Sequence, residues 1–273
     1  MKYIDHHVHT SYSPDAEGEV IDYIKRARMS KQNFIVFTDH ADFGTRDKDF
    51  MVHIDYDRYF KVMKELEEVY AITIKIGVEI GYEKNYKGEI REFLNKYPFD
   101  FVIASIHYGD DKDFYLGDFF QGKSQDQAYK RYFEILLEMV ENFSDYDVVG
   151  HLDYITRYGP YENKYYDYEN YREIVDKILK AIIEKGKGIE VNTSGLREAT
   201  KSPYPKKEVL ESYRNMGGRI ITLGSDAHGV EDYSAGIEEG ISLLESLGFS
   251  ELSQFKQRKE SRLPLSTNKN SLG

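Results

Sequence analysis

The chain has 273 residues, contains no cysteine and carries a formal net charge of −11 at pH 7. The length suits one large domain or two small ones, and the lack of cysteine excludes disulfides and thiolate metal sites. The acidic balance argues against a general nucleic-acid or anionic-membrane surface, but bound divalent cations would still allow an anionic substrate. No window approaches the roughly 18 apolar residues of a membrane span, and no secretory signal is recognisable, so we expect a cytoplasmic protein.

Apolar runs typical of strands alternate with helical patterns along the chain. The expected strands cover residues 2–5, 33–39, 73–79, 99–106, 147–150, 188–192 and 219–225. The expected helices cover residues 17–32, 55–71, 87–96, 124–143, 169–185, 205–217 and 234–247. This alternation gives either an open doubly wound sheet or a closed barrel.

The distribution of histidines and carboxylates favours the barrel. An open sheet gathers its site at one switch point, whereas in this chain nearly every expected strand has such a residue at its carboxyl end. We therefore expect an α/β fold, an irregular TIM-like barrel of seven units that forms one domain over residues 1–273. The polar residues 249–273 are expected to form a peripheral tail, with residues 254–262 packed on the outside.

The longest expected loops cover residues 10–16, 41–54, 108–123 and 152–168. Long functional loops cluster on one face of such folds. We expect aromatic side chains in these loops to form pocket walls, namely Phe114, Tyr115, Phe119, Phe120, Tyr158 and Tyr161.

Two histidine motifs with the same spacing lie near opposite ends of the chain. His7 and His9 follow the first expected strand, and Asp226 and His228 follow the last. Residues two apart on an extended segment point to the same side, so each pair can reach one site. A single buried histidine is more often an ordinary core residue, but imidazole and carboxylate in such pairs, without thiolate, indicate a divalent metal.

Further candidates occur singly. His40, His107 and His151 each lie at a strand end, and Glu79 lies within an apolar strand, where a carboxylate needs a compensating partner. Each alone has an ordinary structural explanation, which for Glu79 is a surface salt bridge. Together, at the same end of successive strands, they indicate a shared metal site. Asp15 on its own resembles a turn residue.

Two arginines follow expected strands on the same face. Arg157 follows the strand that precedes His151, and Arg197 follows the strand over 188–192. The planar guanidinium of arginine can donate two hydrogen bonds to a phosphate, and two arginines can bind the same phosphate from two sides. An average arginine, however, forms a surface ion pair. The chain has no Gly-x-Ser-x-Gly elbow and no Walker or Gly-x-Gly-x-x-Gly loop, which leaves a hydrolase that uses metal-activated water.

These motifs together resemble the polymerase-and-histidinol-phosphatase (PHP) superfamily of metal-dependent phosphoesterases. The resemblance covers most of the chain, and within the superfamily two segments look like the stand-alone histidinol-phosphatase type. Those segments are Gly-His-Leu-Asp-Tyr-Ile-Thr-Arg and Asn-Thr-Ser-Gly-Leu-Arg. The motifs that carry the resemblance occur in the family's order: His7-x-His9, Thr-Asp-His40, Glu79, Ser-x-His107, Gly-His151-x-Asp and Asp226-x-His228.

The resemblance implies a distorted (β/α)7 barrel that holds two or three divalent metal ions, commonly zinc, iron or manganese. Three ligand sets carry over from the family. The first metal would be held by His7, His9, Glu79 and Asp226, the second by Glu79, His107 and His151, and the third by Asp15, His40 and His228. Some relatives have histidine where Asp15 stands, which bears on occupancy of the third site.

The expected function is hydrolysis of a phosphate monoester, most simply L-histidinol phosphate to L-histidinol and phosphate in histidine biosynthesis, by a hydroxide that bridges two metals. The alternatives are another PHP phosphoesterase, acting on phosphotyrosine, nucleotides or DNA ends, and a non-catalytic metal-stabilised regulatory module. We expect a small-molecule partner and neither nucleic acid nor membrane. The expected catalytic residues are Glu79, Asp226, His228 and Arg197, and the expected substrate contacts are Arg157, Arg197, Asp42, Phe119 and Phe120.

Overall fold

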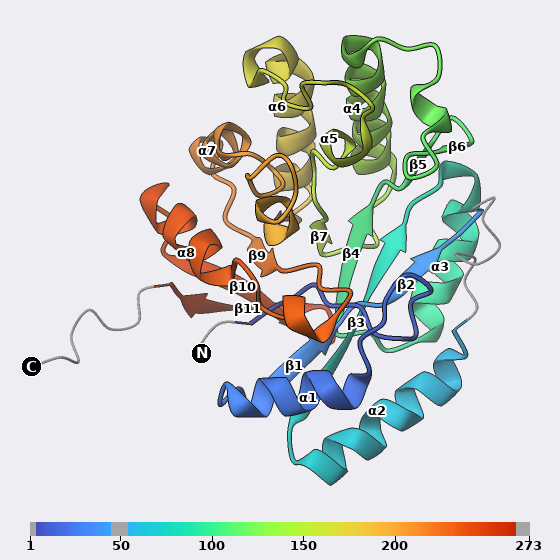
Figure 1. Cartoon of the computed structure of the whole chain (residues 1–273), viewed down its shortest axis with the longest axis vertical. Helices are drawn as coiled ribbons and strands as arrows, with labels where there is room; N and C mark the ends of the chain where they lie inside the picture. Colours follow the sequence, from blue (N-terminus) through green and yellow to red (C-terminus); the bar gives the residue numbers. More distant parts are fainter. Residues whose placement is uncertain (1–3, 45–53, 266–273) are drawn as a thin grey trace, which may run out of the picture.

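The computed structural model describes residues 4–44 and 54–265, and its centre is a curved, entirely parallel sheet (Figure 1). The strand order is β1-β3-β4-β7-β8-β9, with β2 pairing a second part of β3. The strands are β1 Phe34–Phe37, β2 His40–Asp42, β3 Thr73–Gly81, β4 Phe101–Ser105, β7 Val148–Val149, β8 Gly188–Asn192 and β9 Ile221–Gly224. Because β1 and β2 lie end to end along β3, they act as one interrupted strand.

Residues 6–9 close this sheet into a barrel. The backbone N–H of His6 donates to Leu223 (2.9 Å) and that of Asp226 donates to His7 (2.8 Å), so the segment lies beside β9. On its other side Thr38 donates to the carbonyl of Val8 (2.8 Å), which joins it to the end of β1. The expected strand at 2–5 is wrong in position: of its residues, the described ones are not in a strand, and residues 6–9 contain one isolated bridge, Val8 with Ala227.

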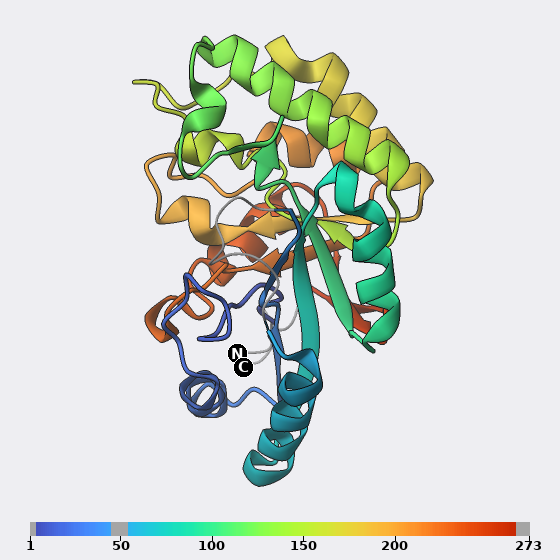
Figure 2. The same cartoon turned by 90° about the vertical axis from the view of Figure 1, so that its right-hand side faces the viewer.

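The major helices surround the outside of the sheet (Figures 1 and 2). They are α1 Val20–Met29, α2 Tyr56–Tyr70, α3 Lys87–Lys96, α4 Gln125–Asn142, α6 Tyr168–Glu184, α7 Lys207–Asn215 and α8 Ile237–Ser246. Each overlaps an expected helix and buries one face; α6, for example, buries Val175, Ile178, Leu179 and Ile182 at helical spacing. Among the described residues, no helix is long and apolar enough to cross a membrane.

Side chains alternate between the two faces of the sheet. Along β4, Val102 and Ala104 belong to the large core under the helices, whereas Phe101 and Ile103 belong to a smaller cluster inside the barrel. Glu79 of β3 is the register partner of Ile103, so its carboxylate also points inward. The strand period of two therefore brings a charged side chain into the barrel interior.

Short elements interrupt the long loops at the carboxyl ends of the strands. They are η1 Lys84–Tyr86, β5 Tyr108–Gly109, β6 Lys112–Asp113, η2 Asp118–Phe120, α5 Ile155–Tyr158, η3 Thr193–Leu196 and η4 Val230–Asp232. The strands β5 and β6 pair as a hairpin whose two turn residues, Asp110 and Asp111, have positive φ values of 54° and 58°. This turn geometry matches the twist of paired strands.

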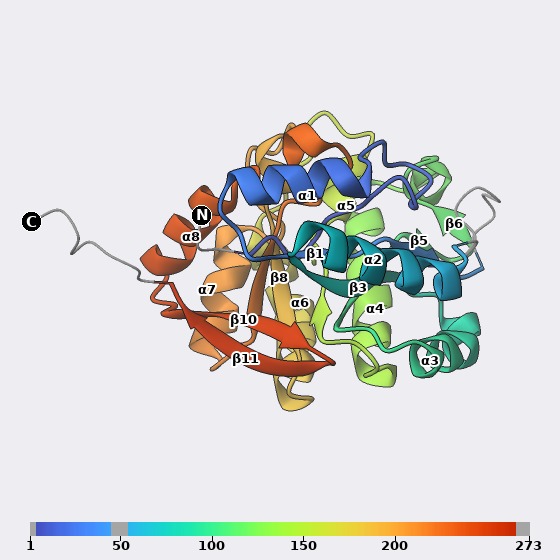
Figure 3. The same cartoon turned by 90° about the horizontal axis from the view of Figure 1, so that it is seen from below.

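The expected C-terminal tail instead contains a β-hairpin at the edge of the molecule, β10 Glu251–Lys256 paired with β11 Lys259–Pro264 (Figure 3). The ring of Phe255 stacks on Phe101, with 5.1 Å between ring centroids. Arg258 Nε lies 2.6 Å from the carboxylate of Asp147. Buried apolar residues within a polar sequence, Leu252 and Phe255, therefore anchor the hairpin to the barrel.

Candidate metal centre

All nine side chains expected to bind metal come together at the carboxyl ends of the strands. Seven of them line a cavity of about 570 Å³, namely Asp15, His40, Glu79, His107, His151, Asp226 and His228. His7 and His9 are fully buried beneath the cavity floor and contact Glu79 and Asp226. The convergence of strand ends therefore produces one site from residues more than 200 positions apart.

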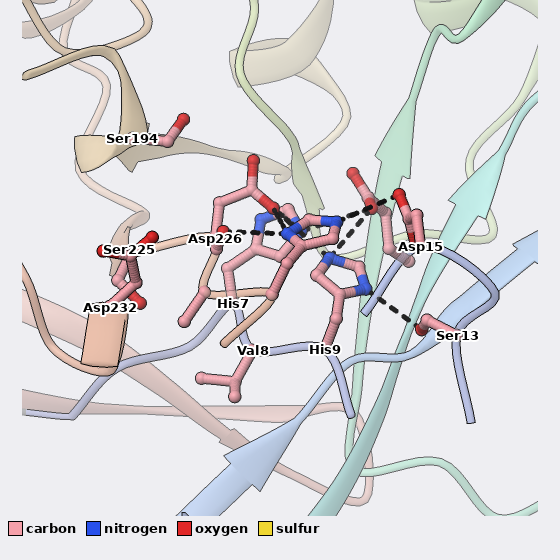
Figure 4. Close-up of polar contacts among 12 residues, drawn as sticks. His7, Val8, His9, Ser13, Asp15, Ser194, Ser225, Asp226 and Asp232 are labelled. Carbon is pink, nitrogen blue, oxygen red and sulfur yellow. Dashed lines mark hydrogen bonds and ion pairs between the residues drawn. The ribbon is translucent and has the colours of Figure 1, made fainter. Parts of the chain in front are cut away.

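The first group of ligand atoms surrounds one oxygen of Glu79. His7 and His9 point to the same side while Val8 between them points away (Figure 4). The Nε2 atoms of His7 and His9 lie 3.2 and 3.4 Å from Glu79 Oε2. The same nitrogens lie 3.6 and 3.3 Å from Asp226 Oδ1.

A second group surrounds the other oxygen of Glu79. His151 Nε2 lies 2.8 Å from Glu79 Oε1, and His107 Nε2 lies 3.5 Å from it. The hydroxyl of Ser105 donates to the same oxygen at 2.6 Å. Glu79 therefore presents one oxygen to each of two histidine groups, which is the arrangement of a carboxylate that bridges two cations.

A third group lies at the mouth of the cavity. Asp15 Oδ2 is 3.1 Å from His228 Nε2 and 3.6 Å from His40 Nε2. The ring of His9 stacks against the imidazoles of both His40 and His228, with centroid distances of 4.2 Å and 4.3 Å. Asp15, which on its own resembles a turn residue, thus lies against two site histidines.

The donor set fits a divalent cation. Within the described ranges, His7 Nε2 and His9 Nε2 are buried without a hydrogen-bond partner, although carboxylate oxygens lie 3.2–3.6 Å away. Two ligands about 2.1 Å from one tetrahedral ion lie about 3.4 Å apart, so these spacings match atoms that share an ion. Nitrogen and oxygen donors of this kind suit divalent transition metals.

Burial and mutual charge set the protonation of the site. Burial lowers the pKa of His7, but Glu190, Glu79 and Asp226 outweigh this effect and raise it well above 6.5. Burial raises the pKa of Glu79, but His7 and other imidazoles hold it well below 4.5. Burial, with the charge of the neighbouring imidazoles of His40 and His228, lowers the pKa of His9 to about 3, so His9 stays neutral as metal ligation requires.

Glu190 of β8 organises the first group from behind. It is fully buried, and its Oε1 accepts from His7 Nδ1 at 2.6 Å, because a carboxylate can only accept. Its Oε2 accepts from the backbone N–H of His151 (3.0 Å) and from Asn192 Nδ2 (3.2 Å). Glu190 was not among the predicted site residues, although it shares with Glu79 the feature of a lone carboxylate in an apolar strand.

Two other buried acids orient His9 and His107. Asp39 accepts from Ser13 Oγ at 2.8 Å, and Ser13 Oγ lies 3.3 Å from His9 Nδ1. Asp42 Oδ1 accepts from His107 Nδ1 at 2.8 Å. A Cβ on Gly81 would lie 1.5 Å from that Asp42 oxygen, so only glycine permits this approach. Such partners fix the ring orientation of ligand histidines.

The backbone is strained at two of the predicted ligands, His151 with a φ of 21° and Asp226. Asp226 has a φ of 54°, in the left-handed region that side-chain-bearing residues seldom occupy. Its Oδ2 accepts from Asn192 Nδ2 at 3.2 Å, and its backbone N–H donates to His7. Strain of this kind persists where surrounding contacts determine the conformation, and it clusters at functional sites.

The two arginines differ in position. Arg157 lines the cavity, with Nη1 3.9 Å from Asp226 Oδ2 and its guanidinium over the rings of Tyr154 and Tyr158. Arg197 does not line it. Arg197 Nη2 donates to the carbonyl of Ser225 at 2.9 Å, and its Nη1 is buried without a hydrogen-bond partner in the part of the chain described.

The loop aromatics divide into core and cavity residues. Phe114, Phe119 and Phe120 are buried, and none of the three lines the cavity; nor does Tyr161. Tyr115 and Tyr158 line it as expected, together with Tyr108 and Tyr154, which the sequence analysis did not single out. Asp42 lines it too, but its bond to His107 gives it an orienting contact.

Comparisons with known proteins point to one family. The model of the PHP domain family matches residues 5–194. The chain is 36% identical over 262 residues to the histidinol-phosphatase of Lactococcus lactis, covering 95% of this chain and 96% of that protein. It is 25% identical over 260 residues to the histidinol-phosphatase of Bacillus subtilis, covering 85% and 96% respectively.

A solved structure matches over nearly the whole chain. It is the histidinol phosphate phosphatase of Lactococcus lactis complexed with zinc, L-histidinol and phosphate. The TM-score is 0.89 at 34% identity, covering 95% of this chain and 99% of that one. The predicted barrel fold and the predicted family resemblance are thus both confirmed.

Proposed function

We propose, from the premise that this chain belongs to the PHP domain family, that it is a metal-dependent phosphatase that hydrolyses L-histidinol phosphate to L-histidinol and phosphate. The observation that carries the proposal is Glu79, whose two oxygens face two separate histidine groups on the floor of one cavity. The Lactococcus relative, whose solved structure contains zinc, L-histidinol and phosphate, supports this substrate.

We assign three ligand sets from the distances between side chains. The first is His7, His9, Glu79 and Asp226, the second is Glu79, His107 and His151, and the third is Asp15, His40 and His228. Zinc, manganese and iron all suit these donors, and two or three ions would fill the three sets. When bound, the ions lower the pKa of water and neutralise charge on phosphate oxygens.

The chain's own residues position the substrate. Arg157 reaches the cavity beside Asp226 and would hold a non-bridging phosphate oxygen. Arg197 does not line the cavity and pairs with Asp232 through Nε, but its buried Nη1 makes no hydrogen bond among the described residues, and we take it as the second candidate for this contact. Positioned positive charge of this kind stabilises a phosphoryl-transfer transition state, whose charge is spread over the phosphate oxygens. Asp226 and His228 belong to the first and third ligand sets, and from there they would orient the attacking water and the leaving oxygen.

The test is phosphate release from L-histidinol phosphate by one preparation, before and after chelation, with elemental analysis of the same sample. We expect turnover that is lost with the metal and returns when zinc or manganese is added. Phosphotyrosine peptides, nucleotides and 5′-phosphorylated oligonucleotides serve as competing substrates. A preference for any of these compounds over L-histidinol phosphate would overturn the proposed substrate. Turnover that survives chelation would overturn the proposed metal-dependent mechanism.

A further inference from the structure

The metal-binding cavity has a wall that the proposed chemistry leaves without a role. Tyr108, Asp113 and Tyr115 line the cavity from the β5–β6 hairpin and the turn that follows it. The wall that carries Arg157 meets it at Tyr158, whose ring centroid lies 5.9 Å from that of Tyr115. The cavity therefore has a cationic wall next to the metal ligands and a second wall that carries a carboxylate.

Asp113 differs from the other acids that line the cavity. Each of those four lies within 3.6 Å of a site imidazole: Asp15, Asp42, Glu79 and Asp226. Within the described residues, Asp113 forms no ion pair with a basic side chain inside 4.0 Å. Its Oδ1 accepts the backbone N–H of Leu116 at 3.0 Å, and its own N–H donates to Asp118 at 2.7 Å. These bonds hold a carboxylate at the cavity wall without neutralising it.

The surroundings of Asp113 suit an organic cation. Burial raises the pKa of Asp113, although backbone hydrogen bonds from Leu116 and Tyr115 and the charge of His107 act in the opposite direction. Tyr115 beside it is 72% exposed although it lines the cavity, and Leu116 is 60% exposed. An exposed aromatic ring next to an unneutralised carboxylate can cover a flat or cationic group and exclude water from it.

We propose that Asp113 binds the cationic end of the substrate and that the ring of Tyr115 covers it, so that this pair determines specificity. The inference rests on the proposed function. If the phosphate is bound by the metal ligands and Arg157, the other end of the ester lies against the wall formed by Tyr108, Asp113 and Tyr115. In L-histidinol phosphate that end carries an ammonium group and an imidazole. The cavity is then matched to a substrate that is negative at one end and positive at the other.

The experiment compares L-histidinol phosphate with a phosphate monoester that has no cationic group, β-glycerol phosphate, in the metal-loaded enzyme. Asp113→Asn keeps the acceptor for Leu116 and removes only the charge. We expect the ratio of kcat/KM for the two esters to fall about ten- to hundredfold, mainly through KM for L-histidinol phosphate, because charge-assisted hydrogen bonds contribute about 1.5–3 kcal/mol. Asp111→Asn is the matched control, since Asp111 is in the same hairpin but does not line the cavity.

The outcomes separate this inference from the function on which it rests. If the unmodified enzyme does not prefer L-histidinol phosphate, the proposed function fails. If it does prefer it and Asp113→Asn keeps the same ratio, the inference is overturned while the function stands. If Asp113→Asn lowers kcat/KM equally for both esters and also lowers the melting temperature, Asp113 has a structural role and the inference is overturned. An analogue without the ammonium, 3-(imidazol-4-yl)propyl phosphate, then shows which cation Asp113 pairs with: a remaining effect of Asp113→Asn identifies the imidazole, and a vanished one the ammonium.

Discussion

Replacing Glu190 by glutamine should weaken metal binding without changing any predicted ligand. Both oxygens of Glu190 accept hydrogen bonds, one from His7 Nδ1 and the other from His151 N and Asn192 Nδ2. The side chain of glutamine has one acceptor oxygen. The orientation that loses fewer hydrogen bonds keeps this oxygen toward the two donors, His151 N and Asn192 Nδ2. The amide N–H₂ then faces His7 Nδ1 and drives the proton of that ring to Nε2, the atom that faces Glu79 and Asp226.

The magnitude follows from the bond that is lost. A hydrogen bond to a charged group contributes about 1.5–3 kcal/mol, which corresponds to roughly 10–150-fold in affinity. Loss of an outer partner of a metal-bound histidine typically costs about 10–100-fold. We therefore expect Glu190→Gln to bind zinc or manganese about 10–100-fold more weakly, with activity recovering at high metal concentration.

The assay is a titration of metal-free protein with zinc or manganese against a competing chelator, together with kcat/KM at each metal concentration. Glu184→Gln is the matched control, because Glu184 is on the exposed surface of α6 and lies 3.8 Å from Lys180. A Glu190→Gln protein whose metal affinity stays within twofold of the parent would refute the argument that this carboxylate sets the tautomer of His7.

Three further predictions follow from the site and the surface. His7→Ala or Asp226→Ala should lose metal content and phosphatase activity together, and full activity without bound metal, measured by elemental analysis, would contradict the ligand assignment. Arg197→Ala should leave the metals bound and raise KM; unchanged KM and kcat would remove this residue from the site. The hydrogen bond from Arg131 lowers the pKa of Asp110 below 3.8. The pair of Asp110 and Arg131 therefore stabilises the fold at pH values above 3.8, and this stabilisation is lost as the pH falls through the lowered pKa. Asp110→Asn should therefore lower the melting temperature slightly at pH 7, and the difference should shrink below pH 4; a difference that does not depend on pH would argue against the ion pair.

The fold could be predicted wherever a long periodic pattern specifies an element. The strand over 188–192 was predicted with its observed bounds, and the helix over 87–96 likewise, because each combines a clear pattern with flanking turn residues. Short elements inside loops, such as β5, β6 and α5, have too few residues to show a period. The first strand was placed too early because closure of the barrel depends on hydrogen bonds to β9, which local sequence does not report.

Sequence position indicated which residues reach the site, but not what orients them. A ligand at a strand end is placed by topology, so the eight proposed ligands at strand ends come together in the structure. Asp15 lies in a loop and was expected only from the family resemblance. The direction of a loop side chain depends on local turns, and therefore Phe119 and Phe120 are buried in the core whereas Tyr115 lines the cavity. Glu190 could have been predicted on the same grounds as Glu79, since both are carboxylates in apolar strands.

The barrel closes where the first proposed ligands lie, so metal binding there would affect how the protein matures. His7 and His9 are on the segment that joins β9 to β1, and Asp226 lies across that junction. During synthesis the histidine pair leaves the ribosome long before Asp226 exists, so a nascent chain has only part of the first coordination set. A metal ion that binds after the chain has left the ribosome would join the two ends of the barrel, and it would stabilise the fold as a cross-link over a long loop does. Metal supply would then govern how much of the newly made protein becomes resistant to proteolysis, in addition to how much of it is active.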